Sequence, residues 1–319
     1  MKTLCKIFLF FVVGNSFSQG AYAPTVGVSG TTAVHKDSSI IVSWANNCIV
    51  TRGLMQINNA ILGFSTQGDS SKAIGKADGV TVSLGDSGVA IYALDTPIYN
   101  GLGNDFAVFE NSFSNTFLEL AFVEVSSDGA NYFRFPSKST TQNMIQIGSF
   151  GTIDCTNIHN LAGKYKVNYG TPFDLEEITN NLLLDKNRIT HIKIIDVIGV
   201  IDSNYASFDS EGNKINDPFP TPFASSGFDL DAIGLININA PVSLAELKSN
   251  FKIYPNPVRD RVTIQSDNEI DWMEIYTLMG VLKLQTKSKS IDLTNFKSGV
   301  YLVKIFSKNT IYVEKLVKK

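Results

Sequence analysis

The stretch GNDFAVFENSF, Gly103–Phe113, places an apolar run between polar residues that could bind a cation. Successive side chains of a β-strand point to opposite faces, so the run divides into two sets. One face carries Asp105, Ala107, Phe109 and Asn111, and the other carries Phe106, Val108 and Glu110. Large apolar residues on both faces are typical of a central strand in a covered sheet. The stretch therefore predicts a core strand whose ends reach the rim of the sheet, where loops meet.

Strand-like segments follow one another through most of the chain. They are rich in β-branched and aromatic residues, and Gly, Asn, Asp and Ser cluster between them. The segments are 40–45, 79–84, 89–94, 106–109, 117–125, 189–198 and 228–238. Only 173–185 has helical spacing, with Leu175, Ile178 and Leu182 on one face. We therefore expect an all-β protein whose body, residues 19–240, is a large two-layer β-sandwich of jelly-roll type.

The first eighteen residues, MKTLCKIFLFFVVGNSFS, have the pattern of a secretory signal peptide. Lys2 and Lys6 precede an apolar run at 7–13, and small residues follow it at a cleavage position. The apolar run is shorter than the roughly 20 residues of a transmembrane helix, and no later segment reaches that length. We expect cleavage near Gln19 and a mature chain without a transmembrane segment.

Two cysteines remain after this cleavage, Cys48 and Cys155. A signal peptide implies an oxidising compartment, so one interpretation is a disulfide between them. It would close a long loop and stabilise the fold by roughly 4–5 kcal/mol. The other interpretation is two unpaired thiols that pack as small hydrophobic groups. The sequence supports both equally.

Residues 251–319 have a different pattern. Short apolar runs alternate with turn residues at intervals of roughly ten, as in a small antiparallel sandwich. The motifs are, in order, YPNP at 254–257, IYTLMG at 275–280, Leu293, GVY at 299–301 and the basic end 315–319. In these motifs the segment resembles the C-terminal sorting domain of the type IX secretion system of Bacteroidetes. The resemblance implies an Ig-like β-sandwich, contact with the type IX secretion machinery, export across the outer membrane, and a secreted or cell-surface location.

The charge divides at the same boundary. Residues 19–250 contain 13 Lys and Arg against 23 Asp and Glu, a net charge of −10, whereas 251–319 contain 12 against 7, a net charge of +5. A body this acidic should repel nucleic acid, so we expect no nucleic-acid partner. Residues 241–250, which begin with a proline, are the expected linker.

A second run, SGFDLDAIGLINI at 226–238, places Asp229 and Asp231 on one strand face, roughly 7 Å apart. Two like charges this close repel unless water, a cation or a basic side chain lies between them. Calcium takes six to eight oxygens from carboxylates, amides and carbonyls. The candidate calcium ligands, if the two runs are neighbouring strands, are Asp105, Glu110, Asn111, Asp229 and Asp231. The alternative is a solvated face with strand-end side chains that bond turn backbones.

The body has a resemblance of its own. It is carried by SLGDSGVAIYALDTPIYNGLGNDFAVFENSF at 83–113, LAFVEVSSDGANYFRFP at 120–136, AGKYKVNYGTPFDL at 162–175 and SGFDLDAIGLIN at 226–237. These motifs are similar to a family of secreted bacterial cell-surface proteins, over about residues 43–237. The resemblance implies that the motifs belong to one domain, and it implies no particular activity or catalytic residues.

Three functions fit these observations. The leading hypothesis is a non-enzymatic domain that binds a glycan or another surface ligand, with calcium as a candidate cofactor. Its aromatic residues could stack on sugar rings, although aromatic side chains in a sandwich are more often core. The second is a glycoside hydrolase or lyase, which needs two carboxyl groups roughly 5–10 Å apart. Glu110 is the best acid candidate, because apolar neighbours raise a carboxyl pKa. The third is a purely structural surface protein.

Overall fold

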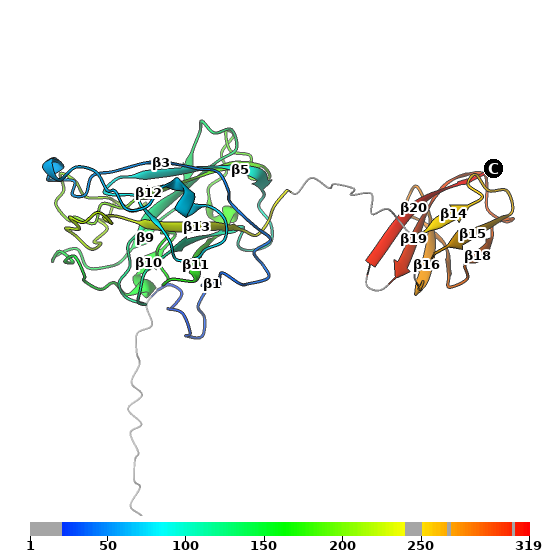
Figure 1. Cartoon of the computed structure of the whole chain (residues 1–319), viewed down its shortest axis with the longest axis horizontal. Helices are drawn as coiled ribbons and strands as arrows, with labels where there is room; N and C mark the ends of the chain where they lie inside the picture. The colour runs from blue at the N-terminus through cyan, green and yellow to red at the C-terminus, as the bar shows by residue number, and fades with distance from the viewer. Residues whose placement is uncertain (1–20, 240–250, 267–268, 308–309) are drawn as a thin grey trace, which may run out of the picture. The chain divides into compact units, whose positions relative to one another are not determined.

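The computed structural model describes residues 21–239, 251–266, 269–307 and 310–319, which form two compact units (Figure 1). One unit lies within 1–240 and the other within 241–319. Each is built from β-strands around its own hydrophobic core. The expected signal peptide, 1–18, and the expected linker, 241–250, lie outside the described residues.

The body contains two antiparallel sheets. The strands of the first are β1 (Val34–His35), β2 (Ser43–Trp44), β4 (Val82–Ser83), β6 (Phe106–Glu110), β11 (Tyr169–Phe173) and β13 (Asp229–Leu235). Its order is β1-β11-β6-β13-β2, and β4 also pairs with β13. The strands of the second are β3 (Cys48–Thr51), β5 (Val89–Ile98), β7 (Ala121–Ser126), β8 (Phe133–Arg134) and β12 (Ile189–Asp196). Their order is β3-β5-β12-β7-β8.

The segments that connect the strands of these two sheets contain only short elements of secondary structure. These are the hairpin of β9 (Lys138–Ser139) with β10 (Ile158–His159), and the 3-10 turns η1 (Ala60–Leu62), η2 (Ser70–Ala73), η3 (Cys155–Asn157) and η4 (Leu175–Glu177). No helix among the described residues has the length and hydropathy needed to cross a membrane.

The chain passes back and forth between the two sheets. It crosses from β5 to β6, returns to β7, and later runs from β11 to β12 and back to β13. Four strands of the first sheet have the order β2-β13-β6-β11, and four strands of the second have the order β5-β12-β7-β8. This is the eight-stranded arrangement of a jelly roll. The predicted jelly-roll sandwich is therefore confirmed.

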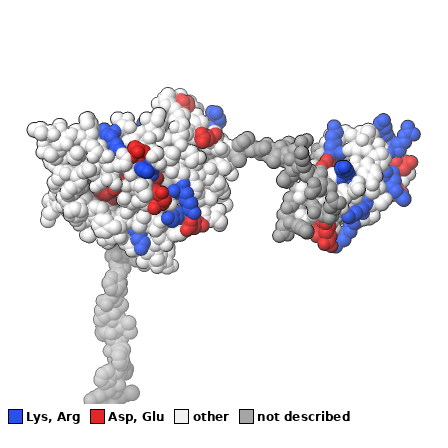
Figure 2. Space-filling view, in the orientation of Figure 1, with Lys and Arg blue, Asp and Glu red and all other residues white. Residues whose placement is uncertain are grey.

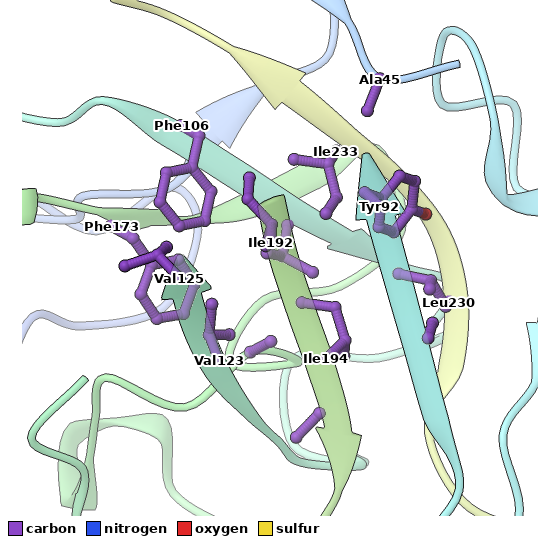
Figure 3. Close-up of a cluster of buried hydrophobic side chains, with 14 of the residues drawn as sticks. Ala45, Tyr92, Phe106, Val123, Val125, Phe173, Ile192, Ile194, Leu230 and Ile233 are labelled. Carbon is purple, nitrogen blue, oxygen red and sulfur yellow. The ribbon is translucent and has the colours of Figure 1, made fainter. Parts of the chain in front are cut away.

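The main core lies between the two sheets. Inward-facing side chains of both sheets form one buried cluster (Figure 3), which includes Tyr92, Phe106, Val123, Val125, Phe173, Ile192, Ile194, Leu230 and Ile233. The outer face of the first sheet is covered too, because Phe109 packs there against Trp44 with ring centroids 5.2 Å apart. Every residue of β6 is buried, and β6 is the middle strand of its sheet. It is the central core strand that its sequence predicted.

Each of the seven predicted segments contains a strand, with ends shifted by a few residues. The helical prediction for 173–185 is wrong, because that segment forms only the short turn η4. Asp174 accepts a hydrogen bond from the Glu176 amide and starts this turn, and the backbone is extended again at Ile178. Leu175 and Ile178 are buried, but Leu182 is fully exposed. The apparent helical face was therefore a loop with two anchoring side chains.

The second unit is a smaller sandwich. One sheet contains β14 (Lys252–Tyr254), β15 (Arg261–Gln265) and β18 (Ser290–Asp292), and the other contains β16 (Trp272–Thr277), β17 (Leu282–Thr286), β19 (Gly299–Ser307) and β20 (Thr310–Lys318). Val262, Ile275, Val303 and Leu316 contribute to the core of this unit. Two antiparallel sheets of three and four strands form an Ig-like sandwich, as expected.

The two cysteines are unpaired, which corrects the disulfide interpretation. Cys48 lies in β3 and packs against the main core. Cys155 lies in η3 and is buried in a separate apolar cluster. Each thiol therefore packs as a small hydrophobic group within a different part of the body.

The packing of the main core can be tested with two isoleucines of opposite exposure. Ile233→Ala should lower the free energy of unfolding by about 2–5 kcal/mol, because Ile233 is completely buried and its removal leaves a cavity. Ile61→Ala, at a side chain that is 96% exposed, should change it by less than about 0.5 kcal/mol. Chemical denaturation measures both values. Equal effects would contradict the proposed core.

Candidate functional site

The structure does not bring the five predicted cation ligands together. Asp105 precedes β6 and Glu110 ends it, so roughly 17 Å of strand separates them. The Asp105 carboxylate accepts hydrogen bonds from the Gly101 amide at 2.8 Å, the Asn237 side chain at 2.7 Å and the Leu175 amide at 2.7 Å. Asp105 therefore holds three segments together at one end of β6.

Asp231 also has a structural role. Leu230 pairs with Glu110 and Ala232 pairs with Phe109, so Asp231 is the extra residue of a β-bulge. Its two carboxylate oxygens accept hydrogen bonds from the amides of Asp78 at 3.2 Å and Gly79 at 3.0 Å. Asp231 therefore fixes the loop before β4.

The other three predicted ligands meet where β6 ends and β13 begins. Asn111 and Asp229 line a cavity of about 360 Å³ there, and Glu110 is buried next to it. The Asn111 side chain donates to Thr81 Oγ1 at 3.2 Å, and the Asp229 carboxylate accepts from the Ser83 hydroxyl. A second carboxylate, Glu119, and hydroxyl side chains from three loops complete the polar part of the lining.

The apolar part of the cavity is a row of phenylalanine rings, which we call the phenylalanine ladder: Phe113, Phe117, Phe150 and Phe223. Neighbouring ring centroids are 4.6, 6.2 and 5.8 Å apart in that order, and the planes of each pair are within 29° of parallel. Phe113 and Phe150 are 71% and 72% exposed. Apolar rings this exposed, in a row beside a polar cavity, are typical of a binding surface.

Hydrogen bonds within and between the loops hold the ladder in place. The Ser112 amide donates to Glu110 Oε2 at 2.8 Å, and the Phe117 amide donates to Ser114 Oγ at 2.8 Å. The Ser149 hydroxyl donates to the Pro220 carbonyl at 2.6 Å, which joins the loop of Phe150 to the loop of Phe223. The cavity is therefore preformed.

Glu119 is positioned by backbone contacts of the two residues that follow it and of its own carbonyl group. The Leu120 amide donates to Asp217 Oδ2 at 2.9 Å, and the Ala121 and Ala162 backbones exchange hydrogen bonds. Gly163, with φ +82°, passes so close that a Cβ there would lie 1.8 Å from the Glu119 carbonyl oxygen. Only glycine permits this approach. Among the described residues, none donates a hydrogen bond to the Glu119 carboxylate.

The ionisable groups in and beside the cavity are mainly carboxyl groups. Burial raises the pKa of Glu119 well above its ordinary value, and the carboxylates of Asp229, Glu110 and Asp217 raise it further. Burial likewise raises the pKa of Glu110 well above its usual range, and one of its oxygens, Oε1, has no hydrogen-bond partner. The pKa of Asp229 is raised by burial to about 6, although the bond from Ser83 and the charge of Arg52 lower it. These groups favour the protonated state, or a bound positive charge.

Sequence reasoning found Glu110, Asn111 and Asp229 but missed Glu119 and the phenylalanine ladder. Many of the other aromatic residues of the body belong to the core, as Tyr92, Phe135 and Tyr165 do. A usable signal was present, because the ladder residues lie in the polar contexts NSFSNTF, GSFGT and TPFASS. A phenylalanine flanked by Ser, Thr, Gly or Asn in a loop has no strand face on which to be buried.

The described residues contain no group of three or more His, Cys, Asp or Glu side chains placed to hold a metal ion. On the face of the body seen in Figure 2, acidic and basic side chains lie beside one another and most of the surface is uncharged. The C-terminal unit carries mainly Lys and Arg in the same view. In this view the body shows both signs of charge, whereas the C-terminal unit shows more basic than acidic side chains.

Comparison with known proteins identifies the C-terminal unit. Residues 252–319 match the family described as the secretion system C-terminal sorting domain. This unit is a type IX sorting domain. A chain that carries such a sorting domain interacts with the type IX secretion machinery and is secreted or held at the cell surface. The resemblance of the body to cell-surface proteins lies outside the sorting domain and stays a prediction.

Other comparisons add little. Among solved structures, HBP35 of Porphyromonas gingivalis matches with 13% sequence identity and a TM-score of 0.17, over 85% of this chain and 64% of that chain. The chain thus spans less than two thirds of that protein, and a likeness this low carries no argument. No curated protein matches the sequence.

Burial of Glu110 predicts how the stability of the body depends on pH. Because its folded-state pKa is raised, its stabilising contribution is complete below about pH 4.5 and is lost as the pH rises through the folded pKa. Glu110→Gln should therefore reduce the fall in unfolding free energy between pH 5 and 7 by up to about 1.4 kcal/mol per pH unit. Urea denaturation at pH 5, 6 and 7 measures this slope.

The matched control is Glu211→Gln, which removes an exposed carboxylate in a salt bridge with Lys138. It should keep the wild-type slope. The same slope in all three proteins would show that Glu110 does not have the raised pKa that we infer.

Proposed function

We propose that the body of this protein is a non-enzymatic glycan-binding domain, which type IX secretion delivers to the cell surface or the medium. The observation that carries the proposal is the phenylalanine ladder beside the polar cavity at the end of β6. The face of an aromatic ring is flat, apolar and electronegative, which suits the C–H face of a sugar ring. The carboxyl, amide and hydroxyl groups of the lining suit sugar hydroxyls.

The size and rigidity of the cavity support this proposal. Its volume of about 360 Å³ is within the range of small-molecule sites. Its loops are joined by hydrogen bonds, so little ordering is needed when a ligand binds. The open row of rings could contact successive units of a chain, whereas the carboxyl groups contact one unit.

A second candidate is carboxylate-based hydrolysis or cleavage of a glycan. The observation that favours it is the pair Glu119 and Asp229 in one cavity, both with a raised pKa. A carboxyl group kept protonated by burial can act as a general acid. Glu119 replaces Glu110 as the acid candidate, because Glu110 does not line the cavity. Release of reducing ends from an oligosaccharide, lost in Glu119→Gln, would favour an enzyme.

A single ring of the ladder tests the glycan proposal. Phe150→Ala should weaken binding to an oligosaccharide identified on a glycan array by about tenfold, which corresponds to about 1.4 kcal/mol. Phe208→Ala is the matched control, because Phe208 is 45% exposed and does not line the cavity. It should leave the affinity unchanged. Calorimetry gives both affinities. If no glycan binds, or if both variants weaken binding equally, the site is not where we place it.

Calcium requires a separate test. Among the described residues, Asn111, Glu119 and Asp229 are the ones that offer side-chain carboxylate or amide oxygens to the cavity. These are fewer oxygens than the six to eight that calcium takes, so we expect glycan binding to change less than about twofold when a chelator is added. Binding and melting temperature are measured with 1 mM calcium and with the chelator. Loss of binding and a lower melting temperature in the chelator would instead support calcium as a cofactor.

A further inference from the structure

The cavity is lined by two carboxyl groups, Glu119 and Asp229, and further acidic groups lie close to it. The charges acting most strongly on Glu119 are those of Asp229, Glu110, Asp217 and Asp196, which are all acidic. Arg52 is the cation whose charge acts on Asp229. Its guanidinium is already bonded to the carbonyls of Gln67, Gly68 and Ser83. No described side chain donates a hydrogen bond to Glu119, although this residue lines the cavity.

The arrangement of these groups suggests what the ligand supplies. Two carboxyl groups and exposed aromatic rings line the same cavity, which suits a cation that is bonded to an apolar ring system. An ammonium group offers three hydrogen-bond donors and one positive charge, which matches two carboxylates. Aromatic faces also attract a nearby cation. A neutral sugar would not stabilise the ionised form of these carboxyl groups.

We propose that the ligand is a glycan with free amino groups, such as a chain of β-linked glucosamine units. The ammonium group binds at Glu119 and Asp229, and a sugar ring lies against the phenylalanine ladder. This inference rests on the proposed glycan-binding function and names the class of glycan.

Proton release is a specific consequence. Before the ligand binds, burial and the charges of four neighbouring acidic groups raise the pKa of Glu119 and so favour its protonated form. The bound ammonium stabilises the ionised form, so the proton leaves Glu119 as the ion pair forms. The reaction is a protonated carboxyl plus an ammonium giving a carboxylate–ammonium pair and one proton in solution. A ligand without a positive charge has no reason to release this proton.

The experiment compares two oligosaccharides with the same backbone and different charge. Calorimetry at pH 6 measures the binding of glucosamine oligomers and of fully N-acetylated glucosamine oligomers to the full-length protein. We expect the amino form to bind at least about tenfold more tightly, because charge-assisted hydrogen bonds are stronger than neutral ones. Repeating the titration in two buffers with different ionisation enthalpies should show net proton release for the amino form alone.

Variants assign the preference to particular residues. Glu119→Gln should abolish the preference for the amino form and reduce the proton release to the part that Asp229 contributes, whereas Glu211→Gln, at an exposed carboxylate outside the cavity, should keep both at the wild-type level. Phe150→Ala should weaken both ligands by the same factor. If Glu119→Gln does not fold, the preference for the amino form is compared between the wild-type protein and Asp229→Asn, which should reduce it.

The outcomes separate this inference from the proposed function. Equal binding of the two forms would overturn the amino preference and leave the glycan site in place. No binding of either form, or of any other oligosaccharide, would overturn both. Equally tight binding of a tetralysine peptide, weakened by Glu119→Gln, would show that the cavity selects a cation and not a sugar.

Discussion

The antiparallel pairing of β6 with β13 is the interaction on which the rest of the body depends. It places the end of one central strand beside the start of another, so that Glu110 lies opposite Leu230 and close to Asp229. The bulge in β13 turns Asp231 to the loop before β4, and Asp229 remains at the cavity. Because the main core and the outer apolar cluster cover the two faces of β6, the register of this pair cannot slip without exposing large side chains.

The buried carboxyl groups beside the β6–β13 pair lower the stability of the folded body. Each is raised in pKa by burial, which means that the folded protein resists the ionised form. Asp196 and Asp217 at least accept backbone hydrogen bonds, from Phe228 and Leu120. Glu119 accepts none from the described residues. A partly buried carboxylate without a protein partner is difficult to explain as a structural element, because an apolar residue there would pack at lower cost.

Much of the fold could be predicted because it depends on local patterns. Alternation predicted β6 as a central strand, and runs of β-branched residues predicted β5, β12 and β13. The sorting domain was recognisable from short motifs in a fixed order. The helix prediction for 173–185 was wrong because two buried side chains three residues apart are compatible with a loop as well as with a helix.

The site could be predicted only in part, since it is formed by residues far apart in the chain. Asp229 and Asn111 were found because each ends or begins a recognisable strand. Glu119 was hidden, because the four residues before β7 look like part of that strand. Whether Phe117, Phe150 and Phe223 would meet could not be read from spacing, because their loops come from three different connections of the jelly roll.

The jelly roll also explains why these loops converge. Connections between strands that alternate between two sheets must cross at the ends of the sandwich, so one end collects loops from β6–β7, β9–β10 and β12–β13. The strands need only supply a rigid frame, while the loops supply rings and hydroxyl groups. Exposed phenylalanines in these loops would be a liability for a protein that stayed at high concentration within a cell. For a chain that its sorting domain directs to the medium or the cell surface, the same rings are outside the cell, where a ligand can reach them.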